Sequence, residues 1–331
     1  MTLMSQLPIA RIAGAADLPH DLRGSVVAIG NFDGVHRGHQ AVLERALSEA
    51  QTLTVPALAL TFEPHPRSVF NPEQPLFRLT PPQMRARLLQ AMGFSAVIEQ
   101  PFSRDFASLG ADEFVNEVLV QDLAACHVVT GYDFHFGKNR QGTPDYLKRM
   151  GAEHGFGVTC VDAFCDEGAD LISSSRIRSL LAEGDVAQAA GLLGYRYSVL
   201  AEVSHGKKLG RQLGFPTANM ALAPETSLRH GIYAVRLRRS DGSLRDGVAS
   251  FGRRPTVDDD GASLLETYVF DFSGDLYGEA CSVSFFGFLR GEVMFDGLDP
   301  LSEQMKRDEA EARALLSGVR PLSALDLAAS F

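Results

Sequence analysis

Short apolar runs alternate with helix-like segments through the first 190 residues of this 331-residue chain. The runs are apolar at nearly every position, which is typical of parallel strands covered on both faces. They read SVVAIG, PALALTF, AVIEQPF, HVVTGYD and GVTCVDAF. Strand, helix and strand repeated in this order predict a doubly wound α/β layer.

Three of the intervening segments carry helix signals. The first has an apolar stripe at the spacing i, i+3, i+4 and i+7, formed by Leu43, Ala46, Leu47 and Ala50. Thr80 with Pro81 opens a second helix, which Gly93 closes. Thr143 with Pro144 opens a third. These helices would serve as the crossovers between the strands.

The pattern changes near residue 190. Strand-like runs then follow one another with turn clusters and no helix between them: YRYSVLAEV, GIYAVRL, DGVASFG, LETYVFDF and EACSVSFFGFL. This pattern predicts a small antiparallel β-barrel. Asp299 as cap and Pro300 at the first helical position predict a terminal helix. We therefore expect two domains of unlike class, covering residues 1–190 and 191–331.

The composition, with 45% hydrophobic and 22% charged residues, is that of a folded globular chain. The apolar runs are too short to cross a bilayer and no leader pattern opens the sequence, so we expect a cytoplasmic protein with no membrane partner. Its four cysteines lack CxxC spacing, which argues against a zinc site or a disulfide framework. A net charge of −10 without a long basic run argues against a nucleic-acid partner, whereas a small anionic ligand needs only a local cluster.

The stretch AIGNFDGVHRGHQAVL, residues 28–43, lies where the first strand passes into the first helix. Ligands bind α/β sheets at this edge. Gly30 and Gly34 permit close backbone approach, and the start of the helix offers N–H groups to an anion. Within a helix His36 and His39 lie on one face and can converge on one phosphoryl group. Taken alone, the motif also fits a capped turn with surface histidines.

Three further segments carry side chains that bind phosphate or an aromatic ring. They are FEPHPRSVF (62–70), GYDFHFGKNRQG (131–142) and ISSSRIRSLL (172–181). The first two follow strands at the same predicted sheet edge, and the third begins a helix after the fifth strand. Together they favour a phosphate site over surface histidines.

The HxGH pattern with ISSxxIR downstream resembles the nucleotidyltransferase superfamily, which transfers adenylyl groups from ATP. With FEPHP and GxDFxFG it resembles the adenylyltransferase half of bacterial FAD synthetases, which join AMP to FMN. The resemblance implies a catalytic and phosphate-binding set, namely Gly30, Asn31, Gly34, His36, His39, Ser174, Ser175 and Arg178. It also implies a flavin pocket shaped by Phe62, His65 and Pro66, with Asp133 nearby.

A second polar segment, HGKKLGRQLGFPTANM, spans residues 205–220 and includes Gly206, Gly210 and Gly214. Alternate residues on a strand point the same way, so Thr217 and Asn219 can offer two oxygens to one hard cation. Mg²⁺ with the phosphates of ATP is the natural ligand of such a pair. The segment is no Walker loop, and by itself it also fits an ordinary strand end with turn glycines.

Three downstream segments, GVASFGRRPTV, LETYVFDFSGDLYG and VSFFGFLRGE, complete a set that resembles the riboflavin kinase domain in order and content. The resemblance implies that Thr217 and Asn219 bind Mg-ATP and that the glycine loop wraps the nucleotide. Glu266 would be the general base on the ribityl hydroxyl, and Arg290 with the terminal helix would close over the flavin. The chain thus resembles bifunctional riboflavin kinase/FMN adenylyltransferases, which convert riboflavin to FMN and FAD with ATP and Mg²⁺.

Three positions depart from the patterns of these families. Ser175 stands where threonine is common and keeps the hydroxyl. His135 stands where arginine is frequent, and Ser250 stands where many relatives have asparagine. Contacts made through the charge or the amide at these two positions would therefore differ.

Two other functions use the same residues. The nucleotidyltransferase could take another acceptor, such as pantetheine phosphate or a nicotinamide mononucleotide, and the chain could be a flavin-binding regulator without catalysis. The barrel motifs argue against the first alternative. The joint presence of His36, His39, Thr217, Asn219 and Glu266 argues against the second. The sequence leaves the oligomeric state open.

Overall fold

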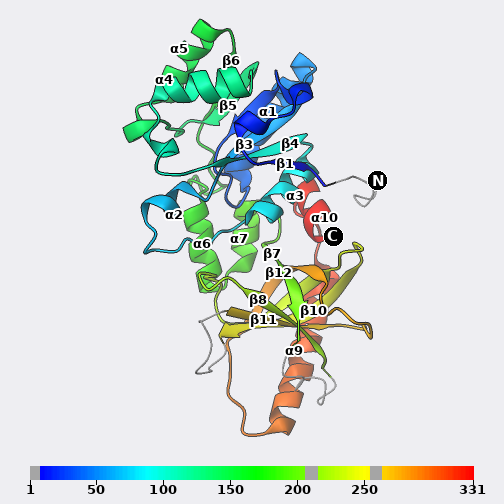
Figure 1. The fold of residues 1–331 in the computed structure, drawn as a ribbon. Helices are drawn as coiled ribbons and strands as arrows, with labels where there is room; N and C mark the ends of the chain where they lie inside the picture. The colour runs from blue at the N-terminus through cyan, green and yellow to red at the C-terminus, as the bar shows by residue number, and fades with distance from the viewer. Residues whose placement is uncertain (1–7, 206–214, 254–262) are drawn as a thin grey trace. The chain divides into compact units, whose positions relative to one another are not determined.

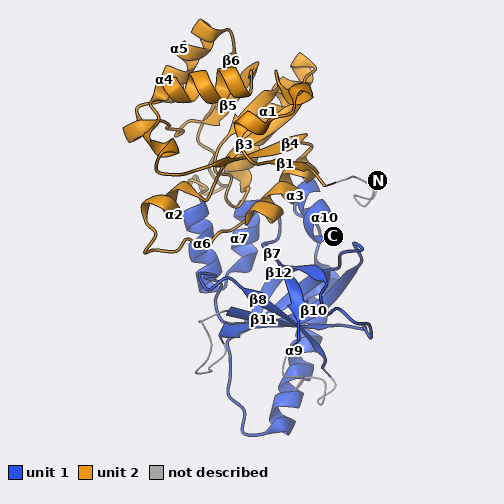
Figure 2. Cartoon of the chain, viewed as in Figure 1, with its two compact units in different colours: residues 1–5, 174–331 blue, residues 6–173 orange. Residues whose placement is uncertain are grey.

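The computed structural model describes residues 8–205, 215–253 and 263–331 (Figure 1). The chain forms two compact units, one of residues 6–173 and the other mainly of residues 174–331 (Figure 2). Among the described residues, no helix combines the length and the apolar character that crossing a bilayer demands.

The first unit is built on a six-stranded sheet with the order β1-β4-β3-β2-β5-β6, in which neighbouring strands are parallel. Its strands are β1 (Ala10–Ile12), β2 (Val26–Ile29), β3 (Ala57–Glu63), β4 (Ala96–Pro101), β5 (His127–Gly131) and β6 (Gly157–Val161). The five apolar runs are confirmed as β2 to β6. The edge strand β1 was not predicted, because its three residues are mostly exposed and too few to show a pattern.

Helices connect these strands as crossovers. They are α1 (Arg37–Leu53), α2 (Pro66–Phe70), α3 (Pro82–Met92), α4 (Ala111–Glu113) and α5 (Pro144–His154). The helical segment η5 (Phe114–Asp122) continues α4, and short 3₁₀ turns lie at Ala15–Asp17, His20–Leu22, Phe106–Ser108 and Lys138–Arg140. α1 packs against β2, β3 and β5, and α5 packs against β6. The apolar stripe of α1 therefore faces the sheet, as its spacing predicts.

Two of the predicted helix ends are confirmed and one is corrected. The Thr143 side chain accepts the N–H of Tyr146 at the start of α5, and Gly93 ends α3 in the left-handed region with φ 107°. Thr80 does not cap α3, whose N-cap is Pro81. The hydroxyl of Thr80 instead bonds the loop that follows β2, at the base of the candidate site.

The strand order changes direction at β2. The chain runs from β2 outward through β3 to β4 on one side, and then returns to place β5 on the other side of β2. In such sheets ligands bind beyond the carboxyl ends of the strands where the order reverses. The histidine motif follows β2 and Asp133 follows β5, so both lie at this edge.

The second unit contains a closed barrel with the strand order β10-β11-β8-β7-β12-β9. Its strands are β7 (Ser198–Ser204), β8 (Thr217–Leu222), β9 (Gly231–Arg238), β10 (Leu244–Arg253), β11 (Ser263–Val269) and β12 (Ala280–Arg290). Each neighbouring pair of these strands is antiparallel. Alternate residues of β11 are buried, so one face of this strand lines the barrel core. The predicted barrel is confirmed.

Four helices accompany the barrel strands in the described part of this unit: α6 (Ser174–Glu183), α7 (Val186–Leu193), α9 (Leu298–Gly318) and α10 (Ala324–Ser330). α9 packs against β9, β10 and β12. Its N-cap is Gly297, so the prediction of Asp299 as the cap was wrong by two residues, and Asp299 lies in the first turn instead. The units divide at residues 173 and 174, ahead of the predicted boundary at 190, because α6 packs on α7 and α7 packs on β12.

Candidate functional site

The loop between β2 and α1 is held in an unusual backbone conformation. Phe32, Gly34 and Val35 have φ angles of 47°, 92° and 38°. Phe32 and Val35 are fully buried, so their side chains fix this loop from the protein interior. Positive φ at bulky residues costs free energy and is concentrated at functional sites. The loop is thus built to hold a backbone shape that an ordinary turn would not adopt.

The two histidines of this loop lie together. His36 is the N-cap of α1, and its Nδ1 accepts the backbone N–H of His39 at 3.3 Å. The two imidazole rings stack with their centroids 3.6 Å apart. The expected convergence on one face is therefore confirmed, while phosphate binding by the pair stays a prediction.

The close packing of His36 against Gly38 explains why the HRGH motif has a glycine at this position. A Cβ atom at this position would lie 3.2 Å from both Cε1 and Nδ1 of His36. Such a distance is tighter than ordinary van der Waals contact between carbon atoms. The glycine therefore lets the His36 ring lean over the first turn of α1.

Replacing Gly38 with alanine should displace the His36 ring and lower FAD formation by about tenfold or more, since small misplacements of catalytic groups have large effects on rate. Chromatography of the flavin products would measure this change, and FMN formation should be unaffected. Gly191→Ala is the matched control, because Gly191 also lies in a helix and a Cβ there meets nothing within 4 Å. Full FAD formation by the Gly38→Ala variant would contradict this account of the motif.

Two polar atoms at this site have no hydrogen-bond partner among the described residues: Oδ1 of Asn31 and Nδ1 of His39. Both atoms are buried, and buried polar atoms are normally satisfied. Burial lowers the pKa of His39 well below its ordinary value of 6.5, and the adjacent His36 lowers it further. His39 is therefore a neutral imidazole at pH 7 that can still donate one hydrogen bond to a ligand.

The predicted flavin residues lie at the ends of β3 and β5. Phe62 is 8% exposed and its ring contacts Phe102 and Phe106, so it is part of the core in this structure. His65 is the N-cap of α2 and Pro66 is the first residue of that helix. Asp133 is exposed in the turn after β5. Their contact with flavin stays a prediction.

The ISSSRIR segment forms the beginning of α6. Ser174 and Ser175 precede Arg178 by four and three residues, so the three side chains lie on one side of this helix. Such a side can present two hydroxyls and a guanidinium to the same phosphate group. This binding also stays a prediction.

The barrel brings Thr217 and Asn219 together on β8. Nδ2 of Asn219 donates a hydrogen bond to the carbonyl of Thr217 at 3.2 Å and lies 3.5 Å from its Oγ1. Oδ1 of Asn219 is buried and has no hydrogen-bond partner in the part of the chain that is described. The two side chains thus face the same way, as expected. Gly206, Gly210 and Gly214 lie outside the described residues.

Strand pairing places Glu266 beside this pair. Glu266 on β11 is the direct cross-strand partner of Asn219 on β8, and Ser250 on β10 is its partner on the other side. Directly opposed residues in an antiparallel pair project from the same face with their Cβ atoms about 5 Å apart. The predicted general base therefore stands next to the predicted cation ligands.

The series of cross-strand partners that runs from Asn219 through Glu266 and Ser250 continues to Arg290. Ser250 pairs with Ile232 on β9, and Ile232 pairs with Arg290 on β12. The guanidinium of Arg290 donates two hydrogen bonds to Asp308 of α9, at 2.8 and 2.6 Å. In this structure Arg290 fixes the terminal helix against the barrel, which the sequence alone did not indicate. Its contact with flavin stays a prediction.

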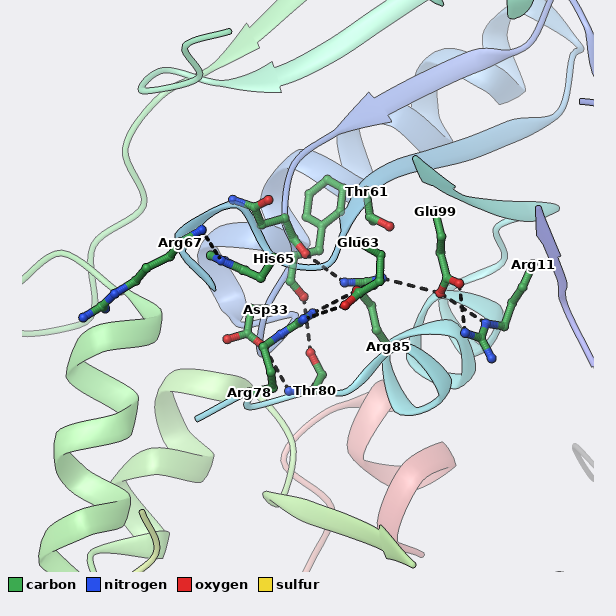
Figure 3. Close-up of polar contacts among 12 residues, drawn as sticks. Arg11, Asp33, Thr61, Glu63, His65, Arg67, Arg78, Thr80, Arg85 and Glu99 are labelled. Atoms are coloured by element: carbon green, nitrogen blue, oxygen red, sulfur yellow. Dashed lines mark hydrogen bonds and ion pairs between the residues drawn. The ribbon is translucent and has the colours of Figure 1, made fainter. Parts of the chain in front are cut away.

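Sequence reasoning missed three polar side chains that contact the loop between β2 and α1, namely Arg78, Thr80 and Arg85. Thr80 bonds Gly34 and Asp33, and Arg85 donates to the carbonyl of Asn31 (Figure 3). Arg78 and Thr80 come from the segment that leads into α3, and Arg85 lies in the first turns of that helix. None of the three belongs to the motifs that predict the site. Only the folded structure brings them to the loop.

Comparisons with known proteins find relatives of both halves of the chain. A model of the FAD synthetase family matches residues 18–176, and a model of the riboflavin kinase family matches residues 193–316. The bifunctional riboflavin kinase/FMN adenylyltransferase of Pseudomonas fluorescens is 41% identical over 92% of this chain and 97% of its own length. The enzyme of the same name from Escherichia coli K12 is 38% identical over 90% of this chain and 95% of its own.

A solved structure is also similar over the whole chain. It is described as a macrolide-efflux protein from Streptococcus pneumoniae, and it is 32% identical with a TM-score of 0.80. The match covers 93% of this chain and 99% of that one. Both family models and full-length relatives therefore agree: this chain belongs to the family of bifunctional riboflavin kinase/FMN adenylyltransferases.

Proposed function

We propose that this chain makes FAD from riboflavin in two ATP-dependent steps, with phosphorylation to FMN at the barrel site and adenylylation of FMN at the His36 site. The observation that carries the proposal is the presence of two separate polar constellations. One surrounds His36 and His39 at the sheet edge, and the other joins Thr217, Asn219 and Glu266 on the barrel. Each falls within the family match for the corresponding activity.

In the adenylyl step an oxygen of the FMN phosphate attacks the α-phosphorus of ATP. The bond from that phosphorus to the bridging oxygen breaks, and pyrophosphate leaves with the electron pair. Because Nδ1 of His36 accepts a backbone N–H, the proton of the neutral ring belongs on Nε2, which can donate to a phosphate oxygen. Catalysis here consists of positioning the reactants and stabilising the charge that develops on the phosphates.

In the kinase step the carboxylate of Glu266 takes the proton of the ribityl hydroxyl as its oxygen attacks the γ-phosphorus, and ADP leaves. A carboxylate is a competent general base when it lies within hydrogen-bonding reach of the hydroxyl. Glu266 is the direct cross-strand partner of Asn219, one of the proposed Mg-ATP ligands. This proximity supports its role over that of a solvated strand carboxylate.

The barrel residues fit Mg²⁺. Oδ1 of Asn219 is a buried oxygen with no hydrogen-bond partner among the residues that the structure describes, and Oγ1 of Thr217 lies next to the same amide. Within the described ranges no group of three or more His, Cys, Asp and Glu side chains could hold a metal ion. Thr217 and Asn219 would therefore share the ion with phosphate oxygens and water, as Mg²⁺ sites with nucleotides usually do. The bound ion would neutralise part of the negative charge on the phosphates.

A purified sample incubated with riboflavin, ATP and Mg²⁺ should form FMN first and FAD later, as resolved by chromatography of the flavins. EDTA should stop both products. Pantetheine phosphate and nicotinamide mononucleotide, offered with ATP, should yield no adenylylated product. Unchanged riboflavin under these conditions would contradict the proposal and favour a flavin-binding role without catalysis.

A further inference from the structure

A network of side chains with alternating charge lies beneath residues 31–34, which we call the nucleotide loop, and extends across the sheet edge (Figure 3). In order, its members are Asp33, Arg78, Glu63, Arg85, Glu99 and Arg11. The successive ion pairs measure 3.5, 2.9, 3.2, 3.5 and 2.8 Å. Arg85 at the centre has a fully buried side chain, whereas Arg11 at the outer end is 41% exposed. The charges balance, with three carboxylates and three guanidinium groups.

Two arginines of this network and the neighbouring Thr80 hold the nucleotide loop at four consecutive residues. Arg85 donates a hydrogen bond to the carbonyl of Asn31 at 3.4 Å, and Arg78 pairs with the Asp33 carboxylate. The hydroxyl of Thr80 accepts the N–H of Gly34 at 2.8 Å and donates to the carbonyl of Phe32 at 3.4 Å. The backbone N–H of Thr80 donates to Asp33. Arg78 and Thr80, which precede α3, and Arg85, which lies within it, thus fix residues 31–34 directly.

Both arginines also contact Glu63, the last residue of β3. Arg78 donates to both carboxylate oxygens of Glu63, at 2.9 and 3.3 Å, and Arg85 donates to Oε2 at 3.2 Å. The residues that follow Glu63 are Pro64 and His65, the turn at which we propose that flavin binds. Each arginine therefore contacts both the nucleotide loop and Glu63, the residue that immediately precedes the flavin-side turn.

The pKa shifts of Glu63 and Arg85 agree with an ion pair between charged groups. Burial raises the pKa of Glu63, but the hydrogen bonds and charges of Arg78 and Arg85 outweigh it, and the pKa lies below the ordinary value of 4.5. Burial and the charge of Arg78 lower the pKa of Arg85, while Glu63 and Glu99 oppose this change. Both groups remain ionised at pH 7, since an arginine titrates far above it.

Stability alone gives little reason for such an arrangement. Taking several charges out of water is costly, and well-packed apolar residues of similar volume often stabilise a protein as well or better. Ion pairs between planar guanidinium and carboxylate groups do, however, fix distances and orientations. The adenylyl step needs that property, because the FMN phosphate must lie in line with the α-phosphorus of ATP.

From this geometry we propose that Arg78 and Arg85 are positioning residues for adenylyl transfer, which set the spacing between the nucleotide loop at Asn31–Gly34 and the flavin-side turn after Glu63. Neither residue needs to touch substrate. The inference rests on the proposed function of the sheet-edge site. It assigns a role to residues that lie outside the HxGH, FEPHP and ISSxxIR motifs.

Arg78→Lys tests the proposal in the full-length chain, because lysine keeps the charge but cannot pair with Asp33 and Glu63 through a rigid fork. The kcat of FMN adenylylation should fall by about tenfold or more, with the KM values for ATP and FMN within about threefold of wild type. Riboflavin phosphorylation in the same sample should not change. Arg11→Lys is the matched control. Arg11 belongs to the same charge network, but Glu99 is the one member of that network that it contacts. It should leave adenylylation unchanged.

Thr80→Val supplies a second test with no change of charge. Valine has nearly the shape of threonine but neither accepts the N–H of Gly34 nor donates to Phe32. We expect it to lower the kcat of adenylylation by about tenfold, in line with the loss of a buried hydrogen bond, and Thr80→Ser to restore most of the rate. A merely structural role would instead lower the melting temperature and leave kcat intact at temperatures where the variant is folded.

The proposal is overturned if Arg78→Lys and Thr80→Val both retain kcat within about twofold of wild type while folded. It is also overturned if Arg11→Lys loses as much activity as Arg78→Lys. These outcomes are distinct from a failure of the proposed function, because in that case the wild-type chain itself would form no FAD in the same assay.

Discussion

Replacing both His36 and His39 with alanine should abolish FAD formation while riboflavin is still phosphorylated to FMN. The two rings stack at the start of α1 and would donate hydrogen bonds to the phosphates that gain charge during adenylyl transfer. Losing even one such donor commonly lowers kcat by about 10²–10³-fold, so the double variant should lose at least this much. Chromatography after incubation with riboflavin, ATP and Mg²⁺ should show FMN accumulating without FAD.

The control for this variant is His154→Ala, because His154 is an exposed histidine in the last turn of α5. It should form FAD at the wild-type rate. If the double variant also stopped forming FMN while its barrel remained folded, the two activities would share a site. Circular dichroism and the melting profile would distinguish that result from unfolding.

Glu266→Gln should give the opposite pattern, blocking FMN formation while FMN supplied from outside is still adenylylated. Glutamine keeps the size of the side chain but cannot accept the ribityl proton as a carboxylate does. General-base catalysis contributes about 10²–10⁴-fold, and the kinase rate should fall by a factor in this range. The rate of FMN formation from riboflavin, with ATP and Mg²⁺ at saturation, measures this effect.

Glu202→Gln is the matched control, since Glu202 is an exposed carboxylate on the barrel strand β7. It should leave both activities intact. Equal kinase rates for Glu266→Gln and the wild type would mean that Glu266 is an ordinary solvated side chain. The cross-strand position beside Asn219 would then have no catalytic meaning.

The parallel sheet was predictable because its strands are buried on both faces, and five uniform apolar runs therefore stand out along the sequence. The edge strand β1 has only three residues, two of them exposed, so no periodicity reveals it. The barrel was predictable for a different reason. Its strands follow one another without helices, and turn residues such as DGS and SGD separate them.

The polar centres of the two sites were also predictable, since their spacing reflects local geometry. His36 and His39 stand one helical turn apart, and Thr217 and Asn219 alternate along a strand. The need for glycine at position 38 could not be predicted, because it depends on how closely the His36 ring approaches this position in the folded structure.

The supporting residues could not be predicted, because their partners are distant in the sequence. Thr80 reads as a helix cap, yet its hydroxyl bonds Gly34, which lies 46 residues earlier. Arg290 is predicted to lie at the flavin, and the sequence gives no sign that its guanidinium also donates two hydrogen bonds to Asp308, 18 residues later. Charge and hydroxyl groups have many possible partners, and tertiary packing selects among them.

The most direct test of two independent sites is to mix the His36→Ala/His39→Ala chain with the Glu266→Gln chain and supply riboflavin, ATP and Mg²⁺. Under multiple-turnover conditions the first chain should release FMN and the second should adenylylate it, so that FAD forms although neither chain makes it alone. Absence of FAD from the mixture, with both single activities intact, would contradict the account of two separate phosphate sites, each complete without the other.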